Sequence, residues 1–303
     1  MLEKLFKLSA NKTDAKTEVL AGITTFMTMA YILAVNPNIL SATGMDSGAV
    51  FTATALAAFL GTLLMAIFAN YPFALAPGMG LNAYFAYTVV IGMGYSWQYA
   101  LTAVFAEGII FILLSLTNVR EAIFNAIPMN LKSAVSVGIG LFIAFVGLQN
   151  AHIVVGGSTL LQLFSVDAYN KANGVEASFN NVGITVILAL AGIIITGILV
   201  VKNIKGNILW GILITWALGI ICQFAGLYVP NADLGFYSLL PDFSKGLSIP
   251  SLAPIFGKLQ FKGIFSVDFI VILFAFLFVD LFDTIGTCLL YTSDAADDLI
   301  GVD

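Results

Sequence analysis

Residues 269–283 read FIVILFAFLFVDLFD, an unbroken apolar run that ends in two aspartates three positions apart. At a rise of 1.5 Å per residue, a helix here carries Asp280 about 18 Å from Asp268, with Asp283 one turn further, close to the middle of a hydrocarbon core about 30 Å thick. The i, i+3 spacing places both carboxylates on one face of the helix. The stretch therefore predicts a membrane-spanning helix with acidic side chains near its midplane.

The whole chain has the composition of a membrane protein. Of its 303 residues, 60% are hydrophobic and 10% are charged, whereas soluble domains carry about 25% charged residues. The net charge of -5, without a basic run, argues against nucleic acid as a partner. Cys222 and Cys288 lie outside any CxxC or Cys/His cluster, so we expect no disulfide framework, no metal site and no cofactor.

Eight stretches are long and apolar enough to span a bilayer. Within a few residues they are 20–38, 49–69, 72–92, 98–117, 133–150, 183–200, 206–226 and 264–290. Counting Lys and Arg on the two sides gives eight against four of the twelve in the chain, and the positive-inside rule then places the N-terminus in the cytoplasm. The sequence predicts an all-α, multi-pass protein of the cell membrane, with a cytoplasmic segment over 1–19 and one membrane domain over 20–287.

The third span contains an interruption. Residues 76–87 read APGMGLNAYFAY, which places Pro77, Gly78, Gly80 and Asn82 in an otherwise apolar segment. Proline removes a helix hydrogen bond and glycine weakens the helix. Discontinuous helices are where secondary transporters build substrate sites at the membrane midplane, so we expect a broken helix whose residues bind a substrate. A kink for close helix packing is the structural alternative.

Three acids lie within the predicted spans: Glu107, Asp280 and Asp283. Intramembrane acids are costly and are functional candidates that face a bundle interior or an aqueous cavity. Asp280 and Asp283 are close together and poorly hydrated, so we do not expect both to be ionised. A held proton suits a proton-coupled carrier, with all three acids as candidates for coupling. A structural carboxyl hydrogen-bonded to a neighbouring helix is the alternative.

Other polar residues give weaker signals. Thr24, Thr25, Thr28 and Asn36 in the first span are expected to bond back to their own helix or across to a neighbour. His152, the sole histidine, follows the fifth span and is expected at a surface or interface.

Four motifs, in this order along the chain, resemble those of one transporter family. They are TTFMTMAYILAVNP at 24–37, NYPFALAPGMGLNAYFAY at 70–87, FAEGIIF at 105–111 and FVDLFDTIGT at 278–287. On these motifs the chain is similar to the xanthine/uracil permeases, which are nucleobase:cation symporters. Within them it most resembles the AzgA-like branch, which takes up adenine, guanine and hypoxanthine.

The resemblance implies a proton-coupled importer of purine nucleobases, with sodium as the other possible coupling ion. It implies fourteen spans in two inverted seven-helix repeats, of which the eight predicted spans would be the first repeat and the first helix of the second. It also implies that Pro77, Gly78, Gly80 and Asn82 hold the base together with Asp280 and Asp283. Glu107 matches a family position to which we assign no role, and the family suggests a homodimer in the lipid bilayer.

Residues 288–303, CLLYTSDAADDLIGVD, depart from the family pattern. TSDAADD resembles translated sequencing-adapter read-through, so we expect a tail of non-family origin. We also expect that the chain, as an incomplete permease domain, does not transport by itself. Saturable uptake of radiolabelled hypoxanthine by this chain would contradict that expectation.

Two alternatives to a purine carrier stay open. One is a uracil/xanthine carrier or another small-solute carrier of the same architecture. The predicted spans contain no basic residue, which favours a neutral hydrogen-bonding ligand over an anion. The other is an intramembrane aspartyl hydrolase that uses Asp280 and Asp283, although two facing helices usually share such a pair.

Overall fold

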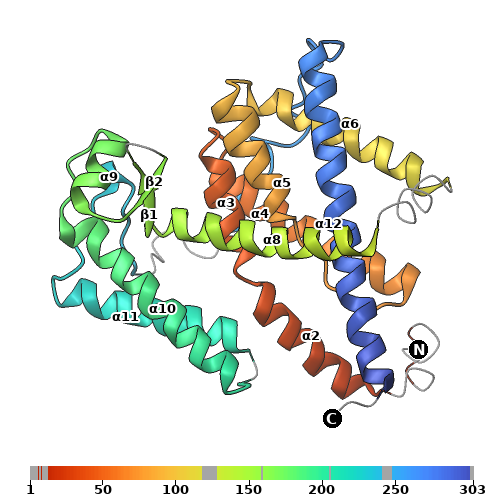
Figure 1. The fold of residues 1–303 in the computed structure, drawn as a ribbon, viewed down its shortest axis with the longest axis horizontal. Helices are drawn as coiled ribbons and strands as arrows, with labels where there is room; N and C mark the ends of the chain where they lie inside the picture. Colours follow the sequence, from red (N-terminus) through yellow and green to blue (C-terminus); the bar gives the residue numbers. More distant parts are fainter. Residues whose placement is uncertain are drawn as a thin grey trace. The chain divides into compact units, whose positions relative to one another are not determined.

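The computed structural model describes residues 6, 8, 13–117, 128–157, 160–204, 206–240 and 248–300, and the chain is mostly helical over these ranges (Figure 1). The α-helices are α2 (Ala15–Met29), α3 (Ile32–Ser41), α4 (Ser47–Leu64), α5 (Met79–Ala83), α6 (Trp97–Ser115), α8 (Met129–Asn150), α9 (Val166–Asn173), α10 (Ile184–Val201), α11 (Asn207–Phe224) and α12 (Val267–Ile300). The π-helical segments are η1 (Met65–Ala69), η2 (Tyr84–Gly92) and η3 (Phe179–Gly183), and η4 (Ala232–Leu234) is a 3-10 turn.

Five helices of the described chain have the length and apolar composition needed to cross a membrane. They are Ala15–Ser41, Ser47–Ala69, Trp97–Ser115, Phe179–Val201 and Asn207–Phe224. Two shorter apolar helices, Met79–Gly92 and Gly140–Asn150, fall in the third and fifth predicted spans, and α12 covers the eighth. The prediction of a multi-pass helical membrane protein is confirmed in this coarser form, while the count of eight spans and the repeat arrangement stay predictions.

Within the candidate span Ala15–Ser41, which covers the first predicted span over 20–38, two turn residues at 30 and 31 separate α2 from α3. Helix α2 ends at Met29 and α3 begins at Ile32. The hydroxyls of Thr24, Thr25 and Thr28 donate to carbonyl oxygens three or four residues earlier, at 2.9, 3.0 and 2.7 Å. These bonds confirm the expected bonding of the threonines to their own helix. Such bonding often bends helices, which is consistent with the interruption that follows.

The chain forms two compact units whose segments alternate along the sequence. Unit 1 comprises Met1–Tyr31, Leu63–Ala74 and Ala144–Ile249, and unit 2 comprises Ile32–Thr62, Leu75–Ile143 and Pro250–Asp303. Neither unit is a contiguous stretch of the chain, and the single membrane domain over 20–287 stays a prediction. Every residue predicted to bind substrate or a proton belongs to unit 2.

Unit 1 is organised around the antiparallel pair α10 and α11, which lie side by side in Figure 1. Small residues permit their close contact. A Cβ added at Gly192 would stand 2.7 Å from the Thr215 hydroxyl, and one added at Gly211 would overlap the Thr196 hydroxyl. Each glycine thus accommodates a threonine of the opposite helix, an arrangement typical of membrane helix pairs.

The segment between α8 and α10, which lies between the fifth and sixth predicted spans, contains a short two-stranded sheet and α9. Strands β1 (Val154–Gly156) and β2 (Leu161–Leu163) pair antiparallel, with Val155 opposite Gln162. His152 lies beside this hairpin, with its ring edge-to-face against Tyr169 at 5.0 Å and Phe236 at 5.9 Å between centroids. Burial lowers the pKa of His152, so the imidazole is neutral at neutral pH.

Replacing Gly211 with valine is expected to destabilise unit 1 by about 1–3 kcal/mol, because the new side chain collides with Thr196. Thermal unfolding of the purified chain in detergent measures the effect. Gly197→Val is the matched control, since Gly197 lies in α10 with no heavy atom within 4 Å of an added Cβ. Equal melting temperatures for the two variants would contradict the close packing of α10 on α11.

Unit 2 packs α12 along α6 and against α5. Phe276 of α12 is 1% exposed, and its ring meets Tyr84 edge-to-face at 5.0 Å and lies 6.5 Å from Phe85. At the start of α12 the Tyr95 hydroxyl donates to Asp268 at 2.6 Å. Aromatic packing and this terminal hydrogen bond together fix α12 beside the helices that carry the other candidate site residues.

Candidate functional site

The third predicted span is discontinuous, as the sequence predicts, but the break lies earlier than expected. Residues 70–78 are non-helical, and α5 begins at Met79 with Gly78 as its N-terminal cap in extended conformation. Gly80 and Asn82 are therefore helical, and the backbone N–H of Asn82 donates to the Gly78 carbonyl at 3.2 Å. Pro77 does not interrupt a helix: it precedes one, where its fixed φ and missing N–H cost nothing. A Cβ at Gly80 would lie 3.9 Å from the Phe142 ring.

The broken segment meets the acidic helix at Gly78. A Cβ built on Gly78 would stand 2.9 Å from Oδ2 of Asp283, closer than real Cβ atoms come to other heavy atoms. Glycine, which has no Cβ, is thus what lets the backbone approach the carboxylate. Two regions about 200 residues apart in sequence, each expected to bind substrate, therefore lie side by side in unit 2.

A chain of side-chain hydrogen bonds holds Asn82. The side-chain amide of Asn82 donates to Asn36 Oδ1 at 2.6 Å, and the side-chain amide of Asn36 donates to the Thr54 hydroxyl at 2.7 Å. Asn36 and Thr54 are 4% and 3% exposed. The Thr54 hydroxyl in turn donates to the Val50 carbonyl at 2.7 Å. The network joins α3, α4 and α5 and fixes the orientation of Asn82, since buried amides are costly to leave unpaired.

The remaining two acids, Glu107 and Asp280, lie on α6 and α12, two helices that pack together. Glu107 is 6% exposed, and within the described part of the chain its Oε1 atom has no hydrogen-bond partner. Asp280 and Asp283 stand one helical turn apart on α12. The structure thus brings Asp283 against Gly78 and buries Glu107 on the neighbouring helix α6.

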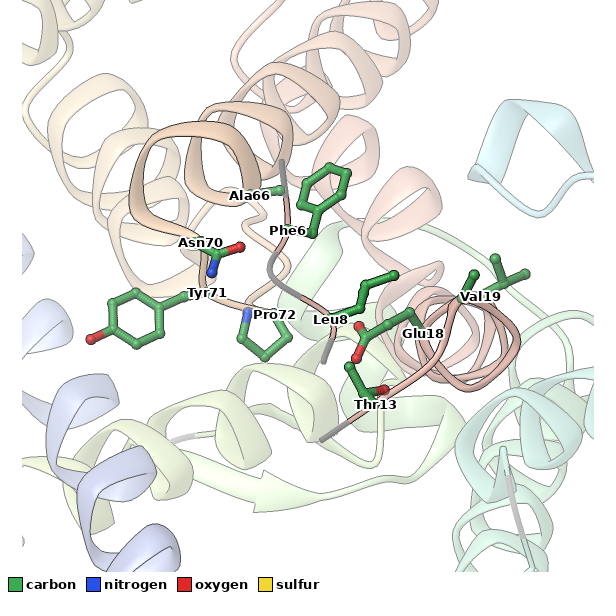
Figure 2. Close-up of a pocket in the computed structure, with 10 residues that line it drawn as sticks. Phe6, Leu8, Thr13, Glu18, Val19, Ala66, Asn70, Tyr71 and Pro72 are labelled. Atoms are coloured by element: carbon green, nitrogen blue, oxygen red, sulfur yellow. The ribbon is translucent and has the colours of Figure 1, made fainter. Parts of the chain in front are cut away.

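A pocket of about 620 Å³ lies in unit 1 (Figure 2), whereas the residues described above belong to unit 2. It is lined by Phe6 and Leu8, by the start of α2, and by the segment from Ala66 to Pro72. None of the residues predicted to bind substrate lines it. Among the described residues, the structure brings together no three His, Cys, Asp or Glu side chains suited to hold a metal ion.

Comparison with known proteins places the sequence among permeases. Residues 16–298 match the model of the permease family. The chain is 47% identical over 295 residues to a putative permease of Methanocaldococcus jannaschii, covering 97% of this chain and 61% of the relative. It is 42% identical over 305 residues to a guanine/hypoxanthine permease of Bacillus subtilis (97% and 63%), and 37% identical over 296 residues to an adenine permease of Escherichia coli (97% and 60%). The chain spans about three fifths of the length of these relatives.

Proposed function

The chain belongs to the permease family, and on that premise we propose that the protein transports purine nucleobases, such as adenine, guanine and hypoxanthine, across the cell membrane. Relatives named as adenine and guanine/hypoxanthine permeases support this substrate class. The proposal includes an N-terminus in the cytoplasm, eight spans in this chain, and coupling to a proton or to sodium. It also includes a homodimer as the assembled form.

The close approach of Gly78 to Asp283 is the observation that supports the substrate site best. A purine presents N–H donors and ring-nitrogen or carbonyl acceptors along its edge. The Asp283 carboxylate accepts from the donors. The non-helical backbone at Pro77 and Gly78 offers the Gly78 N–H as a donor, because Pro77 has no N–H and the Gly78 carbonyl already accepts from the backbone of Asn82. Asn82, one turn further on, supplies an amide that Asn36 orients. Gly80, in the first turn of α5, completes the proposed site.

Binding of labelled purines tests this proposal. Membranes from cells that express the chain are incubated with radiolabelled hypoxanthine, and unlabelled adenine, guanine and uracil compete. We expect saturable binding that purines displace and uracil does not. Displacement by uracil in preference to purines would establish the alternative of a uracil/xanthine carrier, and the absence of saturable binding would overturn the site.

Transport is measured on a chimera, because the chain spans about 61% of its Methanocaldococcus relative. In the chimera, residues 16–283 of this chain replace the matching part of that relative. The chimera is expressed in a host unable to take up purines. We expect saturable hypoxanthine uptake. The permease family match supports a carrier and gives no support to the hydrolase alternative.

A further inference from the structure

The crossover segment, residues 250–266, packs on the first two turns of α4 and α6 before the chain enters α12. The Pro250 carbonyl accepts from the Thr52 hydroxyl of α4 at 2.9 Å. The backbone N–H of Gln260 donates to the Thr102 hydroxyl of α6 at 2.8 Å. All of these residues belong to unit 2, so the crossover segment is fixed to the helices of that unit.

The contact with α6 sets the depth of the crossover segment in the membrane. The candidate span Trp97–Ser115 has 19 residues, which form about 28 Å of helix and barely cover a hydrocarbon core about 30 Å thick. Its first turn therefore lies at the boundary of that core, and Thr102 lies about 7.5 Å further along the helix. The backbone of Gln260, which is bonded to Thr102, is consequently at the membrane interface and not in bulk water.

The crossover segment presents aromatic side chains on its outer side. Phe256, Phe261 and Phe265 are 78%, 58% and 93% exposed, whereas Ile255 between them and α4 is buried in the core of unit 2. Four more exposed apolar side chains follow along α12: Ile270, Val271, Phe274 and Phe278. Water is a poor solvent for such a surface, and lipid at the interface covers it favourably.

The backbone of the crossover segment suits this depth because its own turns satisfy polar groups. The N–H of Phe256 donates to the Leu252 carbonyl at 3.0 Å, and the N–H of Ser266 donates to the Gly263 carbonyl at 3.0 Å. Irregular backbone near lipid requires such internal pairing, since an unpaired N–H or C=O is costly there.

Two lysines stand among these phenylalanines. Lys258 and Lys262 are exposed, and neither has an ion-pair partner within the part of the chain that the structure describes. A lysine at a membrane interface lays its apolar stem along lipid and keeps its ammonium group at the level of the headgroups. The phosphate of a phospholipid lies at that level and carries the complementary charge.

We propose that the crossover segment is a lipid-binding anchor, in which Phe256, Phe261 and Phe265 insert beside the acyl chains while Lys258 and Lys262 bind the phosphate of an anionic phospholipid. In the proposed topology this anchor lies on the outer side of the membrane. It goes beyond the proposed function, because it depends on no transported solute. It also holds the start of α12 at a fixed depth, since the segment runs directly into that helix.

Spin labelling tests the depth of the anchor. A nitroxide is attached at Phe265→Cys in a chain with Cys222→Ser and Cys288→Ser, reconstituted in vesicles of phosphatidylcholine and phosphatidylglycerol. We expect oxygen to relax this nitroxide more than a water-soluble nickel chelate does, and the reverse at Glu176→Cys, an exposed position between α9 and η3. A preference for nickel at both positions would overturn the anchor. Spectral broadening by a second nitroxide would assign the surface to another copy of the chain and overturn it as well.

Thermal unfolding of the purified chain in uncharged detergent tests the phosphate site. Phosphatidylglycerol is expected to raise the melting temperature by about 2–4 °C more than phosphatidylcholine does, because each lysine near an anionic lipid adds a favourable interaction. Lys258→Gln and Lys262→Gln are each expected to lose about half of this difference, and the double variant all of it. Lys171→Gln, which removes one charge from an exposed position of α9, is the control and keeps it.

Inorganic phosphate distinguishes a lipid from a free anion. We expect it to leave the melting temperature of the parent chain unchanged, since it brings no acyl chain to the phenylalanines. A rise as large as that with phosphatidylglycerol would assign the lysines to a soluble anion and overturn the lipid site. Equal stabilisation of the parent and the double lysine variant by phosphatidylglycerol would overturn the role of the lysines.

Discussion

Replacing Asp283 with asparagine is expected to weaken hypoxanthine binding by about 10- to 100-fold. The carboxylate is the charged acceptor at the end of the broken third span, with Oδ2 against Gly78. Hydrogen bonds to charged groups contribute about 1.5–3 kcal/mol, and the amide keeps the size of the side chain while it loses the charge. Equilibrium binding of the labelled base to membranes that contain the variant measures the loss.

Asp268→Asn is the matched control, because it makes the same change on the same helix. Asp268 lies at the start of α12, where it accepts a hydrogen bond from Tyr95, away from Gly78. We expect this variant to bind hypoxanthine like the parent chain. Equal affinities for the Asp283 and Asp268 variants would exclude Asp283 from the substrate site.

The acidic helix and the broken segment could be anticipated because each is a local pattern. An apolar run that ends in two aspartates, and a Pro/Gly cluster within an apolar segment, depart from what lipid tolerates wherever they are placed in the fold. Their meeting at Gly78 was expected only through family resemblance. The exact start of α5 was not predicted, since residues at helix boundaries depend on tertiary contacts as well as on propensity.

The hydrogen-bond network that holds Asn82 could not be predicted from the sequence, for a physical reason. Asn36 and Thr54 are separated by 18 residues, and Asn36 and Asn82 by 46. Their pairing depends on how α3, α4 and α5 are rotated about their axes. Helices that are apolar on all sides do not mark the face that turns inward, so the sequence shows polar residues without showing which of them meet.

Replacing Gly78 with alanine is expected to reduce hypoxanthine affinity by about tenfold or more. The added methyl would stand 2.9 Å from Asp283 Oδ2, so the carboxylate or the backbone must shift. Gly140→Ala is the control: it lies in α8 of the same unit, and an added Cβ has no heavy atom within 4 Å. Binding by the Gly78 variant that equals that of the Gly140 variant would show that the close approach does not matter for the base.

Combining Gly78→Ala with Asp283→Asn shows whether the two substitutions weaken binding through one shared contact or through independent effects. If alanine acts by displacing the carboxylate, it removes little further affinity once the charge is gone, and the double variant binds about as weakly as Asp283→Asn alone. Independent effects would instead multiply, because substitutions without a shared partner add in free energy. Full additivity would mean that Gly78 acts through the backbone of the broken segment alone, whereas the expected non-additivity ties that segment to the carboxylate of α12.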